Sequence, residues 1–487
     1  MKRKYYISLL SIIIITIIIY LTGLYLSGNE RSKTTIFLKS IIPSNVKHLL
    51  KNTVYINQEI KKDNENQIAK VKELEKLYSF KIDALNNLKK ENSSGNFENI
   101  YFEKFKDEKI SSDKNFYNLK VFHSPFLYNP IHPQAKGSAF IEETKKNIII
   151  VDSLGEIYFF KKSDLKSERF FAKNIPNNLR NIIKYQTFYN KYEYSIKDVL
   201  IFDDKIYLSF TNETSKNCFN TSILVSDLKY DYLDFSIFFN PNDCVKKDNI
   251  TGFFNPHIAG GRLVSFNKNH LLFSTGDFQN YKLAQSKDNL FGKILKININ
   301  NKKVDIVSLG HRNVQGLKYD KNKKLIISTE HGPIGGDEIN LNKLVNERIL
   351  NFGWPQASYG DHYTSEKEKR YTLAPLYKNH TKHGYEEPLI YYIPSIAISE
   401  IENVNDLFST SDDKLEDYFV GSLGKDSDNG QLSIHHLKID FEKPEIIKYD
   451  IIRIRERIRD IKYLKELNLV LMFLESSGSI GILKKIQ

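Results

Sequence analysis

Two clusters of polar residues flank one short hairpin in the stretch GHRNVQGLKYDKNKKLIISTEHGPIGGDEINL, which runs from Gly310 to Leu341. Arg312, Asn313 and Gln315 precede the hairpin, and EHGPIGGDE follows it. A hairpin needs only a turn and alternating apolar residues, so the hairpin itself does not explain these groups. Arginine binds carboxylates through two parallel hydrogen bonds, which suits an anionic ligand. Because functional groups concentrate on loops of a rigid scaffold, we expect a binding or catalytic site at these strand ends.

Short strands, not helices, must position these loops, because helical periodicity largely disappears after about residue 115. A polar turn followed by an aromatic or aliphatic strand occurs six times. The copies are SLGE before IYFF, DDK before IYLSF, NKN before HLLFSTG, KNKK before LIISTE, SDDK before LEDYFVGSL, and KELN before LVLMFLE. Most lie roughly 50 to 65 residues apart, with one interval stretched by an insertion around 342–395, and such repeats are typical of β-propellers. We predict an all-β, six-bladed β-propeller; a series of β-sandwiches is the alternative, but it does not explain the recurrence.

The N-terminal segment is almost unbroken apolar sequence from Tyr5 to Leu26, preceded by the basic residues KRK. Its length suits one membrane-spanning helix of about 20 residues. The basic start favours a cytoplasmic N-terminus and an exported remainder. A cleaved signal peptide is the alternative, but the run is long and no Ala-x-Ala site follows it. We predict that residues 1–27 form an uncleaved transmembrane anchor and that the rest of the chain lies in the periplasm.

A helical stalk is expected between the anchor and the propeller, over residues 28–95. Apolar residues recur there at steps of three and four from Ile68 to Leu88, which places them on one helical face. This pattern fits a stalk or short coiled coil that would make a homo-oligomer, and it fits equally a single helix lying against the globular part. The sequence ENSSGN then breaks the pattern, so the propeller domain is assigned to residues 96–487.

The 487-residue chain carries a net charge of +12, which permits attraction to anionic partners. The lysines are scattered, however, and no basic block resembles a DNA-reading element, so we expect no nucleic-acid partner. Cys218 and Cys244 are the two cysteines, too few for a cysteine-rich metal site. They could pair in an oxidising compartment, and we expect that pairing if the domain is exported.

Several motifs together resemble the soluble glucose/sorbosone dehydrogenases, the family that includes aldose sugar dehydrogenases. The motifs GHRNVQG, EHGPIGGDEINL and NFGWP carry the resemblance. AGGRLV, STGD and FGKILKI precede them, and PSIAISEI, VGSL and ERIRDI follow, in the expected order over residues 115–487. Members of this family are six-bladed propellers that use pyrroloquinoline quinone (PQQ) and calcium. Several motifs in register are far more specific than one glycine pattern.

The resemblance implies which side chains would hold PQQ, a cofactor with three carboxylates and an ortho-quinone. Arg312, Asn313 and Gln315 would hold it from one side. Arg457 and Arg459 would hold it from another, since residues two apart on a strand face the same way.

The same resemblance implies two calcium positions. The backbone carbonyls of Gly332 and Pro333 would bind Ca²⁺, a cation that prefers oxygen ligands. The ion would polarise the quinone carbonyl that accepts hydride. Asp337 and Glu338 resemble the family's second, structural calcium position; a turn that closes the loop is the alternative role for these two acids.

His257, in NPHIAGGRLV, is the candidate catalytic base, because a histidine before the Gly-Arg pair removes the sugar hydroxyl's proton in this family. Imidazole suits that role because it titrates near neutral pH. Here His257 lies five residues before Arg262, one more than the usual spacing, so a structural loop histidine is the alternative. Gly424 stands where sugar dehydrogenases of the glucose type often have lysine, and Phe352 replaces a frequent tyrosine. These two positions therefore do not identify which sugar is the substrate.

The resemblance predicts a PQQ- and calcium-dependent enzyme that oxidises an aldose or related alcohol by hydride transfer, and the apolar N-terminal segment predicts that this enzyme is membrane-anchored. Its partners would be the sugar and an electron acceptor, either a quinone or a cytochrome. A non-catalytic propeller that serves as a surface binding or adhesion module is the second hypothesis, since fold does not fix function. The Arg-Asn-x-Gln and Arg-x-Arg sets favour the enzyme, because a binding module does not need converging cations.

Overall fold

The computed structural model describes residues 99–127, 138–190, 193–344, 348–363, 366–408 and 414–486. The chain divides into two compact units, Met1–Gly95 and Asn96–Gln487. The predicted anchor at 1–27 and stalk at 28–95 lie outside the described residues. Within the described ranges, no helix is both long and apolar enough to cross a membrane.

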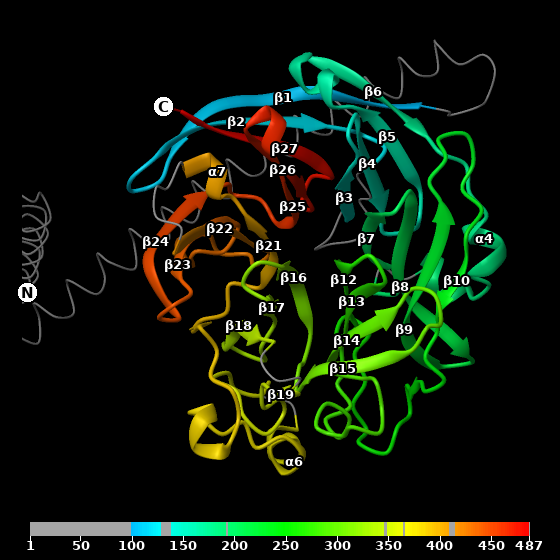
Figure 1. The fold of residues 1–487 in the computed structure, drawn as a ribbon, viewed down its shortest axis with the longest axis vertical. Coiled ribbons are helices and arrows are strands. Elements are labelled where there is room, and N and C mark those ends of the chain that lie inside the picture. Colours follow the sequence, from blue (N-terminus) through cyan, green and yellow to red (C-terminus); the bar gives the residue numbers. More distant parts are fainter. Residues whose placement is uncertain are drawn as a thin grey trace, which may run out of the picture. The chain divides into compact units, whose positions relative to one another are not determined.

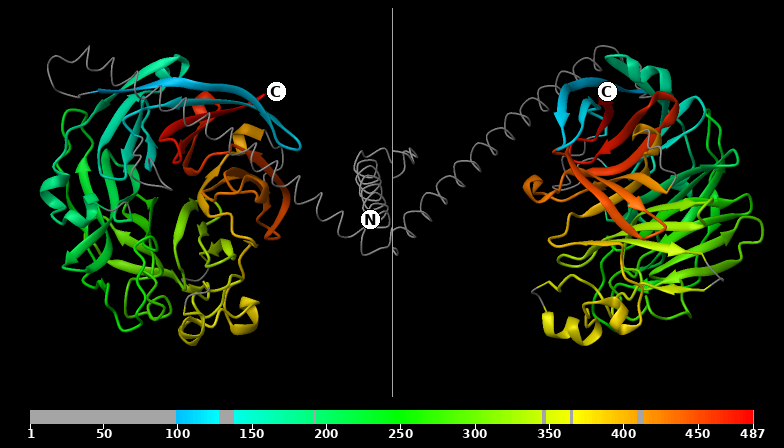
Figure 2. Two further views of the ribbon diagram at one scale, coloured as in Figure 1. Left: turned by 180° about the vertical axis from the view of Figure 1, so that it is seen from behind. Right: turned by 60° about the vertical axis from the view of Figure 1, so that its left-hand side comes forward.

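Strands dominate the described residues and confirm the all-β prediction. They form five sheets in a propeller-like arrangement around a centre (Figure 1), which Figure 2 shows from two further directions. The largest sheet has nine strands, in the order β25 (Ile458–Leu464), β26 (Leu469–Leu474), β27 (Ser479–Ile486), β2 (Phe116–His123), β1 (Asn99–Ser111), β6 (Arg169–Asn174), β5 (Ile157–Lys161), β4 (Asn147–Asp152) and β3 (Ala139–Glu143).

The other four sheets are mostly antiparallel meanders of consecutive strands. The second sheet contains β10 (Ser236–Phe239), β9 (Cys218–Asp227), β8 (Lys205–Ser215) and β7 (Ile196–Phe202), with β11 (Val245–Lys246) paired to β9. The third contains β12 (Gly260–Asn267), β13 (His270–Thr275), β14 (Lys293–Asn298), β15 (Val304–Leu309) and β19 (Leu350–Asn351). The fourth contains β16 (Val314–Asp320), β17 (Leu325–Glu330), β18 (Asp337–Lys343) and β20 (Ile390–Tyr392), and the fifth β21 (Ile398–Asn403), β22 (Leu415–Ser422), β23 (Ser433–Asp440) and β24 (Glu445–Arg453).

Helices are short and lie in the connections between strands. They are η1 (Lys162–Lys166), α4 (Leu179–Ile182), α5 (Gln186–Asn190), α6 (Lys367–Leu373), η2 (His380–His383), α7 (Asn405–Phe408), η3 (Ser427–Asn429) and η4 (Lys465–Leu467). The predicted insertion around 342–395 holds α6 and η2, together with two added strands. β19 pairs parallel with β15 and β20 pairs antiparallel with β18, so the insertion is bound to two neighbouring sheets.

The first and last strands of the described domain are joined. β2 pairs with β27 along its whole length, from Phe116 opposite Ile486 to His123 opposite Ser479. β1 then pairs with β2 on one side and with β6 on the other. The N-terminal strands therefore link the C-terminal strands to β3–β6 and close the ring.

The hydrophobic core lies between neighbouring sheets. Ile327 of β17, Ile398 of β21 and Val420 of β22 belong to one buried cluster. Leu272 of β13 and Ile326 of β17 belong to another, between the third and fourth sheets. Middle strands such as β17 are buried along their whole length, whereas outer strands such as β24 alternate between more buried and more exposed residues.

The innermost strands contact one another in a closed ring, in the order β3, β7, β12, β16, β21, β25 and back to β3. Arg262 on β12 ties this ring together through ion pairs with Asp198 of β7 at 3.0 Å, Glu400 of β21 at 2.8 Å and Asp460 of β25 at 3.3 Å. Arg262 also donates from Nε to the carbonyl oxygen of Gln315 at 2.5 Å. A buried cation with this many partners fixes the relative positions of the strands that carry the site.

Cys218 and Cys244 form a disulfide, with a Cα–Cα distance of 5.4 Å, which confirms the expected pairing. Cys218 begins β9, and Cys244 directly precedes β11. The pairing of Val245 with Phe219 places the two cysteines side by side. The bond thus fastens a short added strand to the second sheet.

Candidate active site

A cavity of about 410 Å³ lies at one end of the ring of inner strands, within the range typical of small-molecule sites. It is lined by the loops that enter and leave those strands. All predicted site residues except Glu338 line it: His257, Arg312, Asn313, Gln315, Gly332, Pro333, Asp337, Arg457 and Arg459.

Arg459 lies at the start of β25 and Arg457 directly precedes this strand. Both arginines share one carboxylate, that of Glu475, which directly follows β26. Nε and Nη2 of Arg459 donate to Oε1 of Glu475 at 2.9 and 2.8 Å, and Nε of Arg457 donates to Oε2 at 2.9 Å. Burial raises the pKa of Glu475, but the cations Arg459 and Arg457 lower it to about 2. The carboxylate is therefore ionised at neutral pH and orients both guanidinium groups.

Arg312 sits in the loop before β16. Its Nη1 donates to the carbonyl oxygen of His331 at 3.0 Å, its backbone N–H donates to Oε2 of Glu330 at 2.8 Å, and its guanidinium carbon lies 5.3 Å from the ring centre of Trp354. Its Nε is buried and has no hydrogen-bond partner in the described residues. A buried N–H without an acceptor costs free energy, so an acceptor bound in the cavity would stabilise this arrangement.

Asn313 and Gln315 connect the arginines to the loop that carries His257. Oε1 of Gln315 accepts from Nη1 of Arg459 at 3.0 Å, and its Nε2 donates to Oδ1 of Asn313 at 3.1 Å. The same Asn313 oxygen accepts from the backbone N–H of Gly260 at 3.1 Å. These hydrogen bonds of the Asn313 and Gln315 side-chain amides therefore connect β25, β16 and the start of β12.

His257 lies in the loop before β12, and its ring is exposed to the cavity. Its backbone N–H donates to Oδ1 of Asn255 at 3.0 Å. The extra residue before Arg262 therefore does not remove His257 from the site. Although much of the His257 surface is exposed, the surrounding cavity walls partly desolvate its ring, and this desolvation together with the cations Lys197 and Arg459 lowers its pKa to about 4. The imidazole is neutral at pH 7 and can accept a proton.

Asp337 closes the glycine-rich loop that follows β17. Its carboxylate accepts from the backbone N–H of Gly332 at 3.0 Å, the hydroxyl of Ser395 at 3.0 Å and the backbone N–H of Ile398 at 3.1 Å. These contacts match the loop-closing role. They also fix the Gly332–Pro333 step, whose carbonyls are the candidate calcium ligands.

Glu338 lies outside the cavity, because successive residues of a strand point to opposite faces. Its Oε2 accepts from Nδ2 of Asn340 at 3.3 Å, and its Oε1 lies 3.6 Å from Nε2 of His380. The two predicted acidic ligands thus face different surroundings. Across the described ranges, no three side chains of His, Cys, Asp or Glu are arranged to hold a metal ion. This finding concerns side chains and does not apply to backbone carbonyl ligands such as those of Gly332 and Pro333.

Sequence reasoning missed Lys197 and Glu475. Lys197 is the second residue of β7, lines the cavity and donates from Nζ to the carbonyl oxygen of Glu193 at 2.8 Å. Burial and the nearby Arg459 lower its pKa to about 7. Glu475 ends LVLMFLE, one of the six repeated strands, but it was not singled out there, and Lys197 belongs to no motif. A charged residue at the axis-facing end of an inner strand could have indicated a site residue. Recognising it requires knowing which strands lie innermost, and that is not known before the strand order is.

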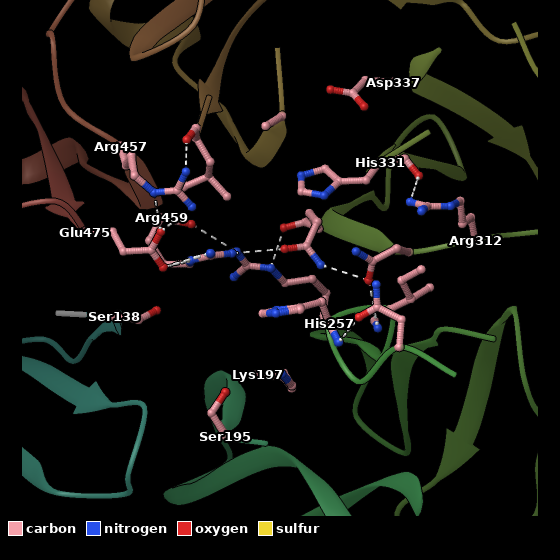
Figure 3. Close-up of a pocket in the computed structure, with 18 of the residues that line it drawn as sticks. Ser138, Ser195, Lys197, His257, Arg312, His331, Asp337, Arg457, Arg459 and Glu475 are labelled. Atoms are coloured by element: carbon pink, nitrogen blue, oxygen red, sulfur yellow. Dashed lines mark hydrogen bonds and ion pairs between the residues drawn. The ribbon is translucent and has the colours of Figure 1, made fainter. Parts of the chain in front are cut away.

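Figure 3 shows how these groups surround the cavity. Arg457, Arg459 and Glu475 lie on one side, and Arg312, His331 and Asp337 lie on another. Ser195 and Lys197 form a third side near His257, and Ser138 lies next to Glu475. The cavity therefore combines cationic forks, a neutral imidazole and hydroxyl groups. Such a set can hold an anionic ligand next to a polyhydroxylated one.

Sequence comparison matches residues 196–483 to the family model of glucose/sorbosone dehydrogenases. The chain is 30% identical over 235 residues to aldose sugar dehydrogenase YliI of Escherichia coli K12, covering 45% of this chain and 58% of that protein. It is 30% identical over 230 residues to an uncharacterised protein of Synechocystis, covering 42% of this chain and 50% of that protein. The chain thus matches between 50% and 58% of the length of these relatives.

Solved structures of the same fold include a glucose dehydrogenase, with a TM-score of 0.56 and 16% identity over 78% of this chain and 100% of that one. The apo-form of a soluble aldose sugar dehydrogenase from Escherichia coli has a TM-score of 0.54 and 19% identity, over 76% of this chain and 99% of that one. At these identities the likeness establishes the fold alone.

Proposed function

The chain belongs to the glucose/sorbosone dehydrogenase family, and we propose that it oxidises an aldose sugar with PQQ and calcium as cofactors. The observation that carries this proposal is the convergence of Arg312, Arg457 and Arg459 on one cavity that also holds a neutral histidine. A propeller that only binds a protein partner does not need this set.

The donor groups of the cavity fit a cofactor with three carboxylates. Two guanidinium groups, those of Arg457 and Arg459, share the single carboxylate of Glu475, so they keep further N–H donors for a ligand. The buried Nε of Arg312 has no acceptor in the described residues. Charge-assisted hydrogen bonds of this kind are about twice as strong as neutral ones. The three arginines would hold PQQ, which supplies a quinone able to accept hydride when it is bound.

His257 would serve as the general base. Oxidation at C1 of an aldose removes one hydride and one proton, and the proton leaves from the anomeric hydroxyl. The pKa of about 4 keeps His257 unprotonated at pH 7, so its imidazole can accept that proton. The carbonyls of Gly332 and Pro333, held by Asp337, would provide oxygen ligands for calcium.

The architecture and location extend this proposal. We infer six blades, since the ring of inner strands has six members and β1 joins two meanders into the nine-stranded sheet.

We further infer that residues 1–27 anchor the protein and that the propeller lies in the periplasm, where a quinone or cytochrome accepts the electrons. The Cys218–Cys244 bond supports an oxidising compartment. Release of the full-length protein from membranes by carbonate would contradict the anchor.

Reconstitution tests the function. Full-length protein in detergent micelles would be incubated with PQQ, with calcium or with a chelator, and assayed with a panel of aldoses and an artificial electron-accepting dye. We expect PQQ uptake that requires calcium, followed by sugar-dependent dye reduction. Protein that takes up no PQQ at any calcium concentration would overturn the proposal.

A further inference from the structure

One cation of the cavity is not used by the proposed cofactor site. Lys197 donates to the carbonyl oxygen of Glu193, and it forms no ion pair with any described residue. Two other lysines on inner strands each have a carboxylate partner: Lys318 pairs with Glu402 at 2.5 Å, and Lys462 pairs with Glu142 at 2.7 Å. Lys197 therefore differs from these lysines in having no anionic partner of its own within the described ranges.

The backbone makes room for this side chain. Gly261 of β12 has φ of +119°, and a Cβ atom placed there would lie 2.3 Å from Cβ of Lys197. Residues with a side chain rarely adopt this conformation, and the contact would be too close in any case. The glycine pair in AGGRLV thus allows the β7 lysine to lie against β12 and reach the cavity.

The side of the cavity around Lys197 has a different chemistry from the arginine sides. It contains the hydroxyl groups of Ser153 and Ser195, together with Asn255 and His257. Figure 3 shows Ser195 and Lys197 on one side of His257, away from Arg312. Hydroxyl and amide groups are suited to a sugar's hydroxyls, and the candidate base lies next to them. A sugar that presents C1 to His257 would place its other groups near this side.

We propose that the substrate is an acidic sugar, one that carries a carboxylate or a phosphate ester, and that Lys197 determines this specificity by binding its anionic group. The inference rests on the proposed sugar oxidation. A neutral sugar would leave the Lys197 ammonium with a carbonyl oxygen as its partner. An anionic group would give it a charge-assisted hydrogen bond, about twice as strong as a neutral one. Such an anion would also favour the protonated, charged form of the Lys197 amine, which burial disfavours.

Calorimetric binding tests this without turnover. Full-length protein in detergent micelles, loaded with PQQ and calcium, would be titrated with methyl β-D-glucuronide and with methyl β-D-glucoside, whose blocked C1 prevents oxidation. We expect the glucuronide to bind about 10- to 100-fold more tightly, as one hydrogen bond to a charged group provides. Lys197→Met and Lys197→Gln should bring the two dissociation constants within about threefold.

Lys205→Met is the matched control. Lys205 lies on the neighbouring strand β8, outside the cavity, and pairs with Asp227 at 2.5 Å on the surface. This variant should keep the glucuronide preference. Circular dichroism and thermal unfolding of each variant would show that the fold is intact.

The outcomes separate the possibilities. Tighter binding of methyl β-D-glucoside 6-phosphate than of the glucuronide would support the acidic class and assign the anion to phosphate. Equal affinity of wild-type protein for the glucoside and the glucuronide would overturn the inference. So would a Lys197→Met variant that loses PQQ affinity but keeps the glucuronide preference, because Lys197 would then bind the cofactor. If the protein takes up no PQQ, the proposed function fails separately, and the same titrations on the cofactor-free protein still test Lys197.

Discussion

Arg459 and Glu475 form an ion pair in which two nitrogens of the arginine donate to one carboxylate oxygen, at 2.9 and 2.8 Å. The other oxygen of Glu475 accepts from Nε of Arg457. Only 1% of the Glu475 surface is exposed. One buried carboxylate thus orients two cations that face the cavity and offsets part of their charge. Without it, the two guanidinium groups would repel each other with no counter-charge between them.

Glu475→Gln should destabilise the cofactor-free protein strongly, because it leaves two arginines without a counter-charge. Breaking a buried ion pair by removing one partner typically costs about 3–5 kcal/mol. Urea unfolding of the full-length variant would measure the loss. Glu442→Gln is the control, since Glu442 pairs with Lys414 on the surface at 2.9 Å and should change stability by less than about 1 kcal/mol. Similar losses in both variants would contradict the role of Glu475.

The same carboxylate predicts a pH window. The pKa of Glu475 is lowered to about 2 from the ordinary value of 4.5. A depressed carboxylate pKa stabilises the fold above the unfolded-state value, and this contribution is lost as pH falls from 4.5 towards 2. Wild-type protein should therefore lose stability across that window more steeply than Glu475→Gln. Parallel curves for the two proteins, measured by urea unfolding at each pH, would refute this assignment.

Arg312→Ala should weaken PQQ binding by about 100-fold or more, because it removes a charged donor from a buried carboxylate. Trp354 is the single tryptophan of the chain and lies 5.3 Å from the guanidinium carbon, so quenching of its fluorescence would report cofactor binding at this position. Arg348→Ala is the matched control, because Arg348 pairs with Glu386 on the exposed surface at 3.1 Å. If both variants bind PQQ equally, Arg312 does not hold the cofactor.

Replacing both Cys218 and Cys244 by serine should lower the free energy of unfolding by about 3 kcal/mol, the entropic contribution of a loop of this size. The bond spans 26 residues and fastens β11 to β9. Denaturant unfolding of the oxidised, the reduced and the double-serine proteins would measure this. Reduction of the wild-type protein should reproduce the effect of the substitutions. An unchanged unfolding midpoint in both cases would show that the bond contributes nothing to stability.

The repeated turn-and-strand pattern located most sheets but not all of their strands. Five of the six copies correspond to the second strand of a meander: β8, β13, β17, β22 and β26. The sixth, IYFF, is β5, whereas the equivalent strand is β4, with the sequence NIIIVD. β1, over Asn99–Ser111, was not expected before residue 115, because its alternating charged residues are typical of a solvated edge.

The site could be predicted only as far as local motifs reach. Arg312, Arg457 and Arg459 were identified because each lies in a recognisable motif. Glu475 and Lys197 are brought to the cavity by pairings between distant strands, and the sequence near them resembles any strand end. The link between Arg459 and Gln315 joins residues 144 positions apart. Such partners follow from the ring closure, which no local pattern specifies.

His257→Ala should leave PQQ bound and remove most turnover, because the side chain acts on the substrate's proton and not on the cofactor. Loss of a general base commonly lowers the rate by about 10²–10⁴-fold. Trp354 fluorescence would confirm cofactor binding, and dye reduction would report turnover. His383→Ala is the control, since His383 stacks on Tyr377 in the insertion, with ring centres 4.3 Å apart, outside the cavity. If the His257→Ala variant turns over sugar at the normal rate, a group other than His257 is the general base.

The pH profile gives a sharper test of the same base. Partial desolvation of the ring and the cations Lys197 and Arg459 lower the pKa of His257, while Glu193 and Glu475 raise it, with a result of about 4. A lowered histidine pKa keeps the imidazole unprotonated at every pH above that value, so kcat/KM should be maintained through pH 6 and fall only as pH approaches 4. Lys197→Gln removes the cation that lowers this pKa most, so the acid limb of the variant should move towards the ordinary histidine value of 6.5. A wild-type limb already centred near 6.5, or one that Lys197→Gln does not move, would show that a different group accepts the proton.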